Sequence, residues 1–222
     1  MTNGSQTIAF LGLGNMGGPM AANLVKAGNE VRGFDPVEAA QDAARQAGVT
    51  VCESPAQAVE GASVVITMLP NGALVTSTYS EVLSSAEKGT LFIDSSTISV
   101  DDARAVHAQA VDAGMLQVDA PVSGGVKGAT AGTLAFMVGG EDEAFAAAQP
   151  VLEPMAGKII HCGGTGAGQA AKVCNNMVLA VHQIAIGEAF VLAERLGLSH
   201  QALHDVVTGA TGNSWALHTN CP

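Results

Sequence analysis

The amino-acid sequence predicts an α/β fold: a doubly wound, mostly parallel sheet, then a long helix and part of an all-α domain. Short apolar runs alternate with helix-patterned stretches over residues 7–161, a βαβα rhythm typical of a parallel sheet with helices on both faces. After Gly163-Gly164-Thr165-Gly166 the alternation stops, and residues 168–196 form one helical pattern without proline. We therefore expect a sheet domain at residues 1–165 and the start of a helical domain at residues 166–222.

The short apolar runs are the predicted strands. They lie at residues 7–11, 30–34, 63–67, 91–94, 116–119, 134–138 and 158–161. Alanine-rich stretches between several of them predict covering helices, for instance at 37–47, 100–113 and 141–153. The long helical pattern corresponds to about eight turns at 3.6 residues each. A further helix is expected at about 200–210, with Ser199 as its N-cap.

The first strand leads into a glycine-rich turn. Residues 7–11 are followed by Gly12-Leu13-Gly14-Asn15-Met16-Gly17 and at once by a helix-compatible stretch. Gly12 permits a tight turn, Gly14 lacks the Cβ that would block a phosphate, and Gly17 lets the helix pack on the strand. The N-terminus of that helix favours an anion. This order of elements predicts a Rossmann-type dinucleotide site rather than a plain packing turn between strand and helix.

The second strand ends just before an acidic residue, Asp35. A carboxylate there can accept hydrogen bonds from both ribose hydroxyls of an adenosine and repels a 2′-phosphate, so NAD is favoured over NADP. Arg32 is a contrary signal, because an arginine near the end of this strand can bind a 2′-phosphate. Successive residues of a strand point to opposite faces, so we expect Arg32 to point away from Asp35 as a surface charge.

Composition narrows the classes of function. A formal net charge of −11 argues against nucleic acid and anionic membranes as partners. Charged residues are 13% and apolar residues 48%, so we expect some apolar surface to be buried between subunits of a homodimer or homotetramer. Four cysteines without a CxxC pair indicate reduced thiols. Without a secretory-signal pattern at the N-terminus, the expected location is cytoplasmic.

The most apolar stretch lies within the long helical pattern. Residues 177–193 are strongly apolar, yet His182 and Glu188 interrupt them. A helix buried on most sides fits this pattern better than a membrane span. One long and one short helix cannot enclose a core of their own, so the second unit is expected to be incomplete or to need a partner chain.

Loops at the ends of later strands are further candidates, because ligands bind at the carboxyl edge of a doubly wound sheet. Leu69 and Pro70 follow one strand and Thr97 another, and they are either ligand contacts or ordinary loop residues. The segment Ser123-Gly124-Gly125 is more informative. Consecutive small residues can aim several backbone N–H groups at one carboxylate.

Lys172 stands on one face of the long helix with Asn176, four residues later. Burying an ammonium in an apolar helix is costly and lowers its pKa, which suits a residue that donates and accepts a proton. The alternative is a lysine whose stem lies along the helix edge while its ammonium reaches water. Spacing alone favours that second interpretation.

Together these motifs resemble one family. The runs GLGNMGGPMAANL, MLPNG, SST, DAPVSGGVKGATAGTL and GAGQAAKVCNNM are similar in order and spacing to those of the 3-hydroxyisobutyrate dehydrogenases, which are β-hydroxyacid dehydrogenases. The resemblance covers about residues 7–222. It implies an NAD-dependent oxidoreductase of valine catabolism that converts 3-hydroxyisobutyrate to methylmalonate semialdehyde. KVCNNM and NSWALHTNCP look more like this branch than like the tartronate semialdehyde (2-hydroxy-3-oxopropionate) reductases.

The resemblance also implies a role for each matching residue. Lys172 would be the catalytic acid/base, and Asn176 would help to orient the substrate. The substrate carboxylate would be held by Ser123, Gly124 and Gly125. The residues implied for NAD binding are Gly12, Leu13, Gly14, Asn15, Met16, Gly17, Asp35, Leu69, Pro70 and Thr97. No metal is expected, because hydride transfer to NAD needs none and the pair His200 and His204 lacks a third ligand nearby.

The family resemblance makes residues 166–222 the start of a helical substrate and dimerisation domain. Its members continue with several more helices, so we expect either a piece of a longer protein or a shortened variant. In the second case the alternative to an enzyme is a non-catalytic NAD-binding subunit.

Overall fold

The computed structural model describes residues 6–220 of the chain. Contacts within the chain divide it into two compact units, with the boundary between Lys172 and Val173. The boundary expected from the sequence, between residues 165 and 166, lies just before the long helix begins. The observed division instead falls within that helix, so its first turns belong to the first unit.

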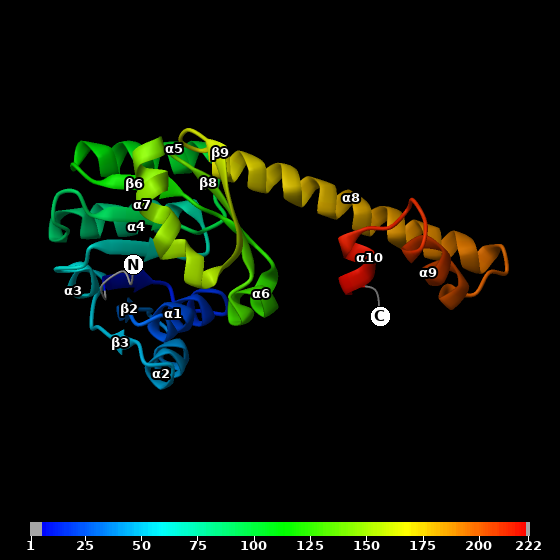
Figure 1. Cartoon of the computed structure of the whole chain (residues 1–222), viewed down its shortest axis with the longest axis horizontal. Coiled ribbons are helices and arrows are strands. Elements are labelled where there is room, and N and C mark those ends of the chain that lie inside the picture. The colour runs from blue at the N-terminus through cyan, green and yellow to red at the C-terminus, as the bar shows by residue number, and fades with distance from the viewer. Residues whose placement is uncertain (1–5, 221–222) are drawn as a thin grey trace. The chain divides into compact units, whose positions relative to one another are not determined.

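The first unit is built on a mostly parallel sheet with helices on both faces, which confirms the predicted fold class (Figure 1). The strands are β1 (Thr7–Leu11), β2 (Glu30–Phe34), β3 (Thr50–Val51), β4 (Val64–Thr67), β5 (Leu91–Asp94), β6 (Leu116–Asp119), β7 (Val122–Ser123), β8 (Leu134–Gly139) and β9 (Ala156–Gly163). Their order is β3-β2-β1-β4-β5-β6-β8-β7, and β9 pairs with β8. From β1 the chain adds β2 and β3 on one side of β1, and after β3 it crosses to the other side and adds β4. This reversal leaves a crevice between β1 and β4, which is where ligands bind in sheets of this kind.

Two apolar clusters cover the two faces of the sheet. Ile8 and Phe10 of β1 belong to one cluster, whereas Ala9 and Leu11 belong to the other, because alternate residues of a strand face opposite sides. Helices α1 (Gly17–Lys26), α2 (Glu38–Gln46), α6 (Gly125–Ala131) and α7 (Asp142–Leu152) add to the first cluster. Helices α3 (Pro55–Val59), α4 (Gly72–Val82) and α5 (Val100–Asp112) add to the second. This double cover leaves the carboxyl edge of the strands for ligands.

The last strands reverse the chain beyond that carboxyl edge. Strand β8 runs antiparallel to β6 and β7, and its last residue, Gly139, pairs with Asp119 at the end of β6. Strand β9 runs parallel to β8 and brings Gly163 beside Gly139. The long helix α8 (Ala167–Arg195) therefore starts next to the carboxyl ends of β5 and β6.

The described part of the second unit holds the rest of α8 together with α9 (His200–Thr208) and α10 (Trp215–Asn220). The expected cap of α9 is present, because the side chain of Ser199 accepts a hydrogen bond from the N–H of Ala202 at 3.2 Å. The function expected for residues 166–222, substrate binding and dimerisation, stays a prediction.

The expectation that the long helix is buried on most sides is wrong within this chain. Half or more of each of these apolar side chains is exposed: Val173, Met177, Val178, Val181, Ile184, Val191 and Leu192. The reason is length, because α8 has 29 residues while α9 has nine and α10 has six. By length and composition α8 is also sufficient to cross a membrane, and 6% of its most apolar window is buried.

Candidate functional site

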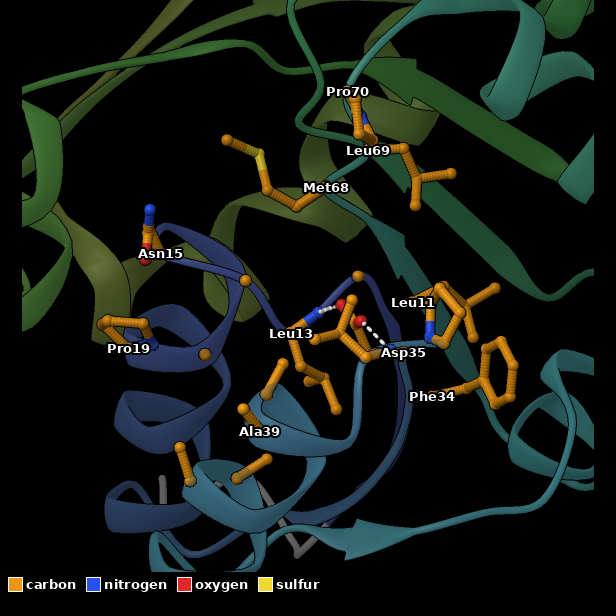
Figure 2. Close-up of a pocket in the computed structure, with 18 of the residues that line it drawn as sticks. Leu11, Leu13, Asn15, Pro19, Phe34, Asp35, Ala39, Met68, Leu69 and Pro70 are labelled. Atoms are coloured by element: carbon orange, nitrogen blue, oxygen red, sulfur yellow. Dashed lines mark hydrogen bonds between the residues drawn. The ribbon is translucent and has the colours of Figure 1, made fainter.

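A cleft of about 1100 Å³ opens at the carboxyl edge beside β1, where the strand order reverses. Figure 2 shows its walls, which are the glycine-rich turn, the end of β2 and the loop after β4. The predicted cofactor residues in its lining are Gly12, Leu13, Gly14, Asn15, Asp35, Leu69 and Pro70. Sequence reasoning missed the other side of the cleft, where α2 and α4 contribute Ala40, Ser77, Thr78 and Glu81.

The three glycines of the turn differ in what surrounds them. Gly12 has a φ of +97°, and a Cβ there would collide with the carbonyl of Met68. A Cβ on Gly17 would collide with the carbonyl of Gly12 and press on the ring of Phe10. At Gly14 a Cβ would meet nothing within 4 Å. The turn is thus tightly packed beneath and open toward the cleft, which fits the approach of a pyrophosphate to its backbone.

Asp35 is fixed at the end of β2 by two backbone N–H groups. Its Oδ2 accepts from Leu13 and its Oδ1 from Val37, each at 2.8 Å, and the residue is 8% exposed (Figure 2). Each carboxylate oxygen keeps a lone pair free for another donor. The carboxylate therefore both orders the glycine-rich turn and presents acceptors to the cleft, as ribose hydroxyls require.

Arg32 is held away from this carboxylate. Its Nε contacts the carboxylate of Glu30 at 2.9 Å, and its Nη1 donates to the carbonyl of Glu60 at 2.9 Å. Arg32 is not part of the cleft lining. These contacts agree with the expectation that Arg32 is a surface charge.

Three of the predicted cofactor residues lie outside the cleft lining. Met16 is half-buried and packs against the core, and Gly17 is buried beneath the turn. Thr97 is exposed on the loop after β5. Its neighbour Ser96 links that loop to the cleft wall, because the Oγ of Ser96 accepts from the N–H of Leu69 at 2.9 Å.

The segment predicted to bind the substrate carboxylate, Ser123-Gly124-Gly125, lies where β7 leads into α6. Gly124 has a φ of 135° and Gly125 a φ of 60°, a pair of conformations that other residues rarely adopt. Both glycines are exposed, and Ser123 is half-buried. The loop backbone is accessible to a ligand, while its role in binding a carboxylate stays a prediction.

Lys172 is the last residue of the first unit and lies half-buried on α8, where burial lowers the pKa of its ammonium. Asn176 follows on the same helix within the second unit, exposed, and its Oδ1 accepts from Nδ2 of Asn175 at 3.3 Å. A lowered pKa makes Lys172 a better proton acceptor at neutral pH. The roles expected for both residues stay predictions.

Comparison with known proteins places these features in one family. Residues 7–164 match the family model described as the NAD binding domain of 6-phosphogluconate dehydrogenase. Residues 166–222 match the model described as the NAD-binding region of NADP-dependent 3-hydroxyisobutyrate dehydrogenase. A probable 3-hydroxyisobutyrate dehydrogenase of Mycobacterium tuberculosis is 70% identical over 216 residues, or 97% of this chain and 74% of that protein. The chain belongs to the 3-hydroxyisobutyrate dehydrogenase family.

Two further matches bear on the family's chemistry. A solved structure of the Mycobacterium tuberculosis 3-hydroxyisobutyrate dehydrogenase with L-serine has a TM-score of 0.94 and 70% identity, covering 98% of this chain and 75% of that one. An NAD-dependent L-serine dehydrogenase of Pseudomonas aeruginosa is 46% identical over 97% of this chain and 73% of its own length. As a 3-hydroxyisobutyrate dehydrogenase family member, this protein is an NAD-dependent oxidoreductase, which confirms the expected enzyme class and cofactor.

Two buried carboxylates of this family member were not among the predicted site residues. Asp119, which is fully buried, accepts from the N–H of Gly166 at 2.7 Å and from that of Gln169 at 2.8 Å. Asp94 accepts from Oγ1 of Thr67 at 2.8 Å. Burial raises the pKa of both carboxyls, that of Asp94 to about 6. The available sequence signal was their shared position, since each is an acid that ends an apolar strand.

No group of three potential metal ligands comes together within residues 6–220. The ring of His200 instead packs edge-on against the ring of Phe190, with the two ring centroids 5.4 Å apart. Cys52, Cys162 and Cys174 are free thiols, and Cys221 lies outside the described residues.

Proposed function

We propose that this protein oxidises the primary hydroxyl of 3-hydroxyisobutyrate to methylmalonate semialdehyde with NAD. The observation that carries the proposal is Lys172, a half-buried amine of lowered pKa on a helix that starts at the carboxyl edge of the NAD-binding sheet. A non-catalytic NAD-binding protein would need no proton acceptor at this position. The relatives named 3-hydroxyisobutyrate dehydrogenase support this choice of substrate.

Oxidation of an alcohol to an aldehyde removes a hydride from carbon and a proton from oxygen, and a C=O bond forms. Bound NAD supplies the hydride acceptor. Lys172 in its neutral form accepts the hydroxyl proton, and in the reverse direction its ammonium returns that proton to oxygen. Burial favours the neutral amine, because it disfavours the charged form.

The remaining residues orient the reactants. The backbone of Ser123, Gly124 and Gly125 holds the substrate carboxylate, a role that suits an exposed loop with two successive glycines of positive φ. Asn176 adds an amide one helical turn after Lys172 for orienting the substrate. Fixing the substrate at its carboxylate selects which hydrogen faces the nicotinamide.

The same proposal includes a preference for NAD over NADP. One matching family model names NADP, so membership of the family does not by itself select NAD over NADP. The proposed preference rests on residues of this chain. Asp35 presents a carboxylate to the cleft, where a 2′-phosphate would be repelled. Arg32, the residue that could offset this repulsion, is bound to Glu30 and Glu60.

L-Serine is the second candidate substrate, because one relative is named an L-serine dehydrogenase and a solved relative is described with L-serine. L-Serine and 3-hydroxyisobutyrate share a carboxylate and a primary hydroxyl on the third carbon. They differ in an ammonium against a methyl group on the second carbon. Two less favoured functions are those of a tartronate semialdehyde reductase and of a non-catalytic NAD-binding subunit.

Steady-state kinetics separate these functions. kcat/KM is measured with NAD for oxidation of both enantiomers of 3-hydroxyisobutyrate and of serine, and with NADH for reduction of methylmalonate semialdehyde and tartronate semialdehyde. The proposal expects the highest value for 3-hydroxyisobutyrate in oxidation and for methylmalonate semialdehyde in reduction. A higher value for L-serine in oxidation, or for tartronate semialdehyde in reduction, would overturn the proposed substrate. NAD binding in calorimetry without turnover of any compound would identify a non-catalytic subunit.

Lys172→Ala tests the proposed chemistry. Turnover is expected to fall by about 10²–10⁴-fold, the range for a positioned acid/base, with little change in the Kd for NAD. Lys158→Ala, which removes an exposed lysine of β9, serves as the matched control and should retain wild-type turnover. Equal losses of turnover and of NAD affinity in Lys172→Ala would contradict the assigned role.

A further inference from the structure

The first turn of α8 is fastened to the ends of β5 and β6 by two buried side chains. We propose that Gln169, supported by Asp119, is a positioning residue that sets where Lys172 stands relative to the Thr97 loop. The inference rests on the proposed function, since it concerns the placement of the proposed proton acceptor. It adds a role to Gln169, which lies outside the residues expected to touch substrate or NAD.

Gln169 spans the loop that carries Thr97. The residue is 1% exposed. Its Nε2 donates to the carbonyl of Ser96 at 2.7 Å, and its Oε1 accepts from the N–H of Ile98 at 3.2 Å. One amide thus holds the backbone on both sides of Thr97. Ser96 continues the contact to the cleft wall, because its Oγ accepts from the N–H of Leu69.

Asp119 holds the backbone of the same turn. Its two oxygens accept from the N–H groups of Gly166 and Gln169, which lack partners within the helix at its N-terminus. A negative charge there also interacts favourably with the helix dipole. Asp119 lies at the end of β6, so the start of α8 is bound to the sheet itself.

The fit between helix and sheet is tight. A Cβ on Gly168 would collide with the carbonyl of Met137 and lie 2.6 Å from that of Asp119. A Cβ on Gly139, at the end of β8, would lie 2.6 Å from the N of Gly168. The first turn of α8 therefore rests directly on strand backbone, at a distance that only glycine allows.

The position of Lys172 depends on this first turn of α8. It follows Gln169 by three residues, so the two side chains leave the helix on neighbouring positions of one face. Proton transfer requires the amine within hydrogen-bond reach of the hydroxyl, and a misplacement of about 1 Å can cost on the order of 10²-fold in rate. A turn held by Gln169 and Asp119 is the means of avoiding that misplacement.

A double-mutant cycle tests whether Gln169 acts through Lys172. Gln169→Met keeps the length of the side chain and removes both hydrogen bonds. In the full chain it is expected to lower kcat by about 10–100-fold, within the range for misplacement, with the Kd for NAD changed by less than about threefold. In a Lys172→Ala background the same substitution is expected to lower kcat by less than about twofold, because the group being positioned is gone.

Gln57→Met is the matched control. Gln57 is exposed on α3, and its Oε1 likewise accepts a backbone N–H, that of Glu53, at 2.7 Å. Loss of this hydrogen bond is expected to leave kcat unchanged. Gln169→Asn is the second variant, because it keeps a neutral amide on a shorter stem that cannot reach both Ser96 and Ile98. It adds no charge to this buried turn, so it should fold if Gln169→Met does not, and its loss of kcat should show the same dependence on Lys172.

The outcomes separate this inference from the function on which it rests. Equal factors of loss with and without Lys172 would overturn the positioning role and leave Lys172 as the proton acceptor. A loss confined to thermal stability, with kcat retained well below the unfolding temperature, would also overturn it. If Lys172→Ala itself retains turnover, the proposed function fails first and the positioning role falls with it.

Discussion

At the scale of single residues, three aspartates in equivalent places have different surroundings. Asp35, Asp94 and Asp119 each stand at the carboxyl end of a parallel strand or just after it. Asp35 lines the cleft. Asp119 accepts hydrogen bonds from backbone N–H groups at the start of α8, and Asp94 is buried in the core. The topology supplies the same position three times, and the neighbours decide whether the carboxylate is free for a ligand.

Replacing Asp35 should change cofactor preference. A hydrogen bond to a charged group contributes about 1.5–3 kcal/mol, so Asp35→Ala is expected to lower kcat/KM with NAD by about 10–100-fold. With NADP the value should hold or rise, because the repulsion of the 2′-phosphate is removed. Kinetics with both cofactors measure the ratio.

The Asp35→Ala substitution also removes the acceptors for Leu13 and Val37, so Asp35→Asn is the second variant. It keeps one acceptor for the turn and loses the charge. Arg32→Ala is the control, expected to leave the NAD/NADP ratio unchanged because its guanidinium is engaged elsewhere. An unchanged ratio in both Asp35 variants would remove this residue from cofactor selection.

At the scale of elements, how far the sequence predicts the structure depends on how local the signal is. The strands at 7–11, 30–34, 91–94 and 116–119 have the predicted bounds, since each is a short run between turn residues that is either apolar or, at 30–34, alternates between buried and less buried residues. Strands β3 and β7 were missed because two residues show no period. The glycine-rich turn was likewise predictable, because its residues are contiguous.

The fastening of α8 was not predictable in the same way. Gln169 binds Ser96 and Asp119, partners distant along the chain, and neither contact leaves a periodic trace in the sequence. The burial of α8 was misjudged for a related reason. Apolar composition indicates that a surface is covered, but it does not identify the chain that covers it.

The exposed apolar face of α8 underlies our proposal that the protein forms a homo-oligomer. Contiguous exposed apolar surface of this kind is typical of an interface. Light scattering coupled to size exclusion is expected to give at least twice the chain mass of 22.2 kDa. Ile184→Asp, at a position 62% exposed, should shift that mass toward the monomer. Val111→Asp, on exposed surface of α5, is the control. A monomeric wild-type protein at micromolar concentration would contradict the proposal.

At the scale of the whole molecule, the core contains a polar patch whose charge opposes folding. Asp94 is 1% exposed, and within residues 6–220 its Oδ2 has no hydrogen-bond partner. Tyr79 and Gln117 also have an unpartnered polar atom among the described residues. An ionised carboxylate in such surroundings is costly, which is why the pKa of Asp94 rises.

Stability should therefore depend on pH through Asp94. Its pKa rises from 3.8 to about 6 on folding, so the folded state binds the proton more tightly. The associated stability is fully present below about pH 4 and is lost as the pH rises through 6. Asp94→Asn removes the charge, so it should unfold at a higher temperature than wild type at pH 8, with the difference shrinking toward pH 4.

Thermal unfolding at several pH values measures this difference. Asp112→Asn, at an exposed position on α5, is the control and should show no such trend. A difference between Asp94→Asn and wild type that is the same at pH 4 and pH 8 would show that shape rather than charge is responsible.

The boundary between the units falls directly after Lys172, while the turn that anchors α8 lies before it. Lys172 therefore belongs to the same compact unit as the sheet. A chimaera that joins residues up to 172 to the corresponding remainder of another family member would take Lys172 and the contacts that hold the start of α8 from one parent, and Asn176 from the other. Recombination at this junction would exchange the second unit and leave those contacts intact.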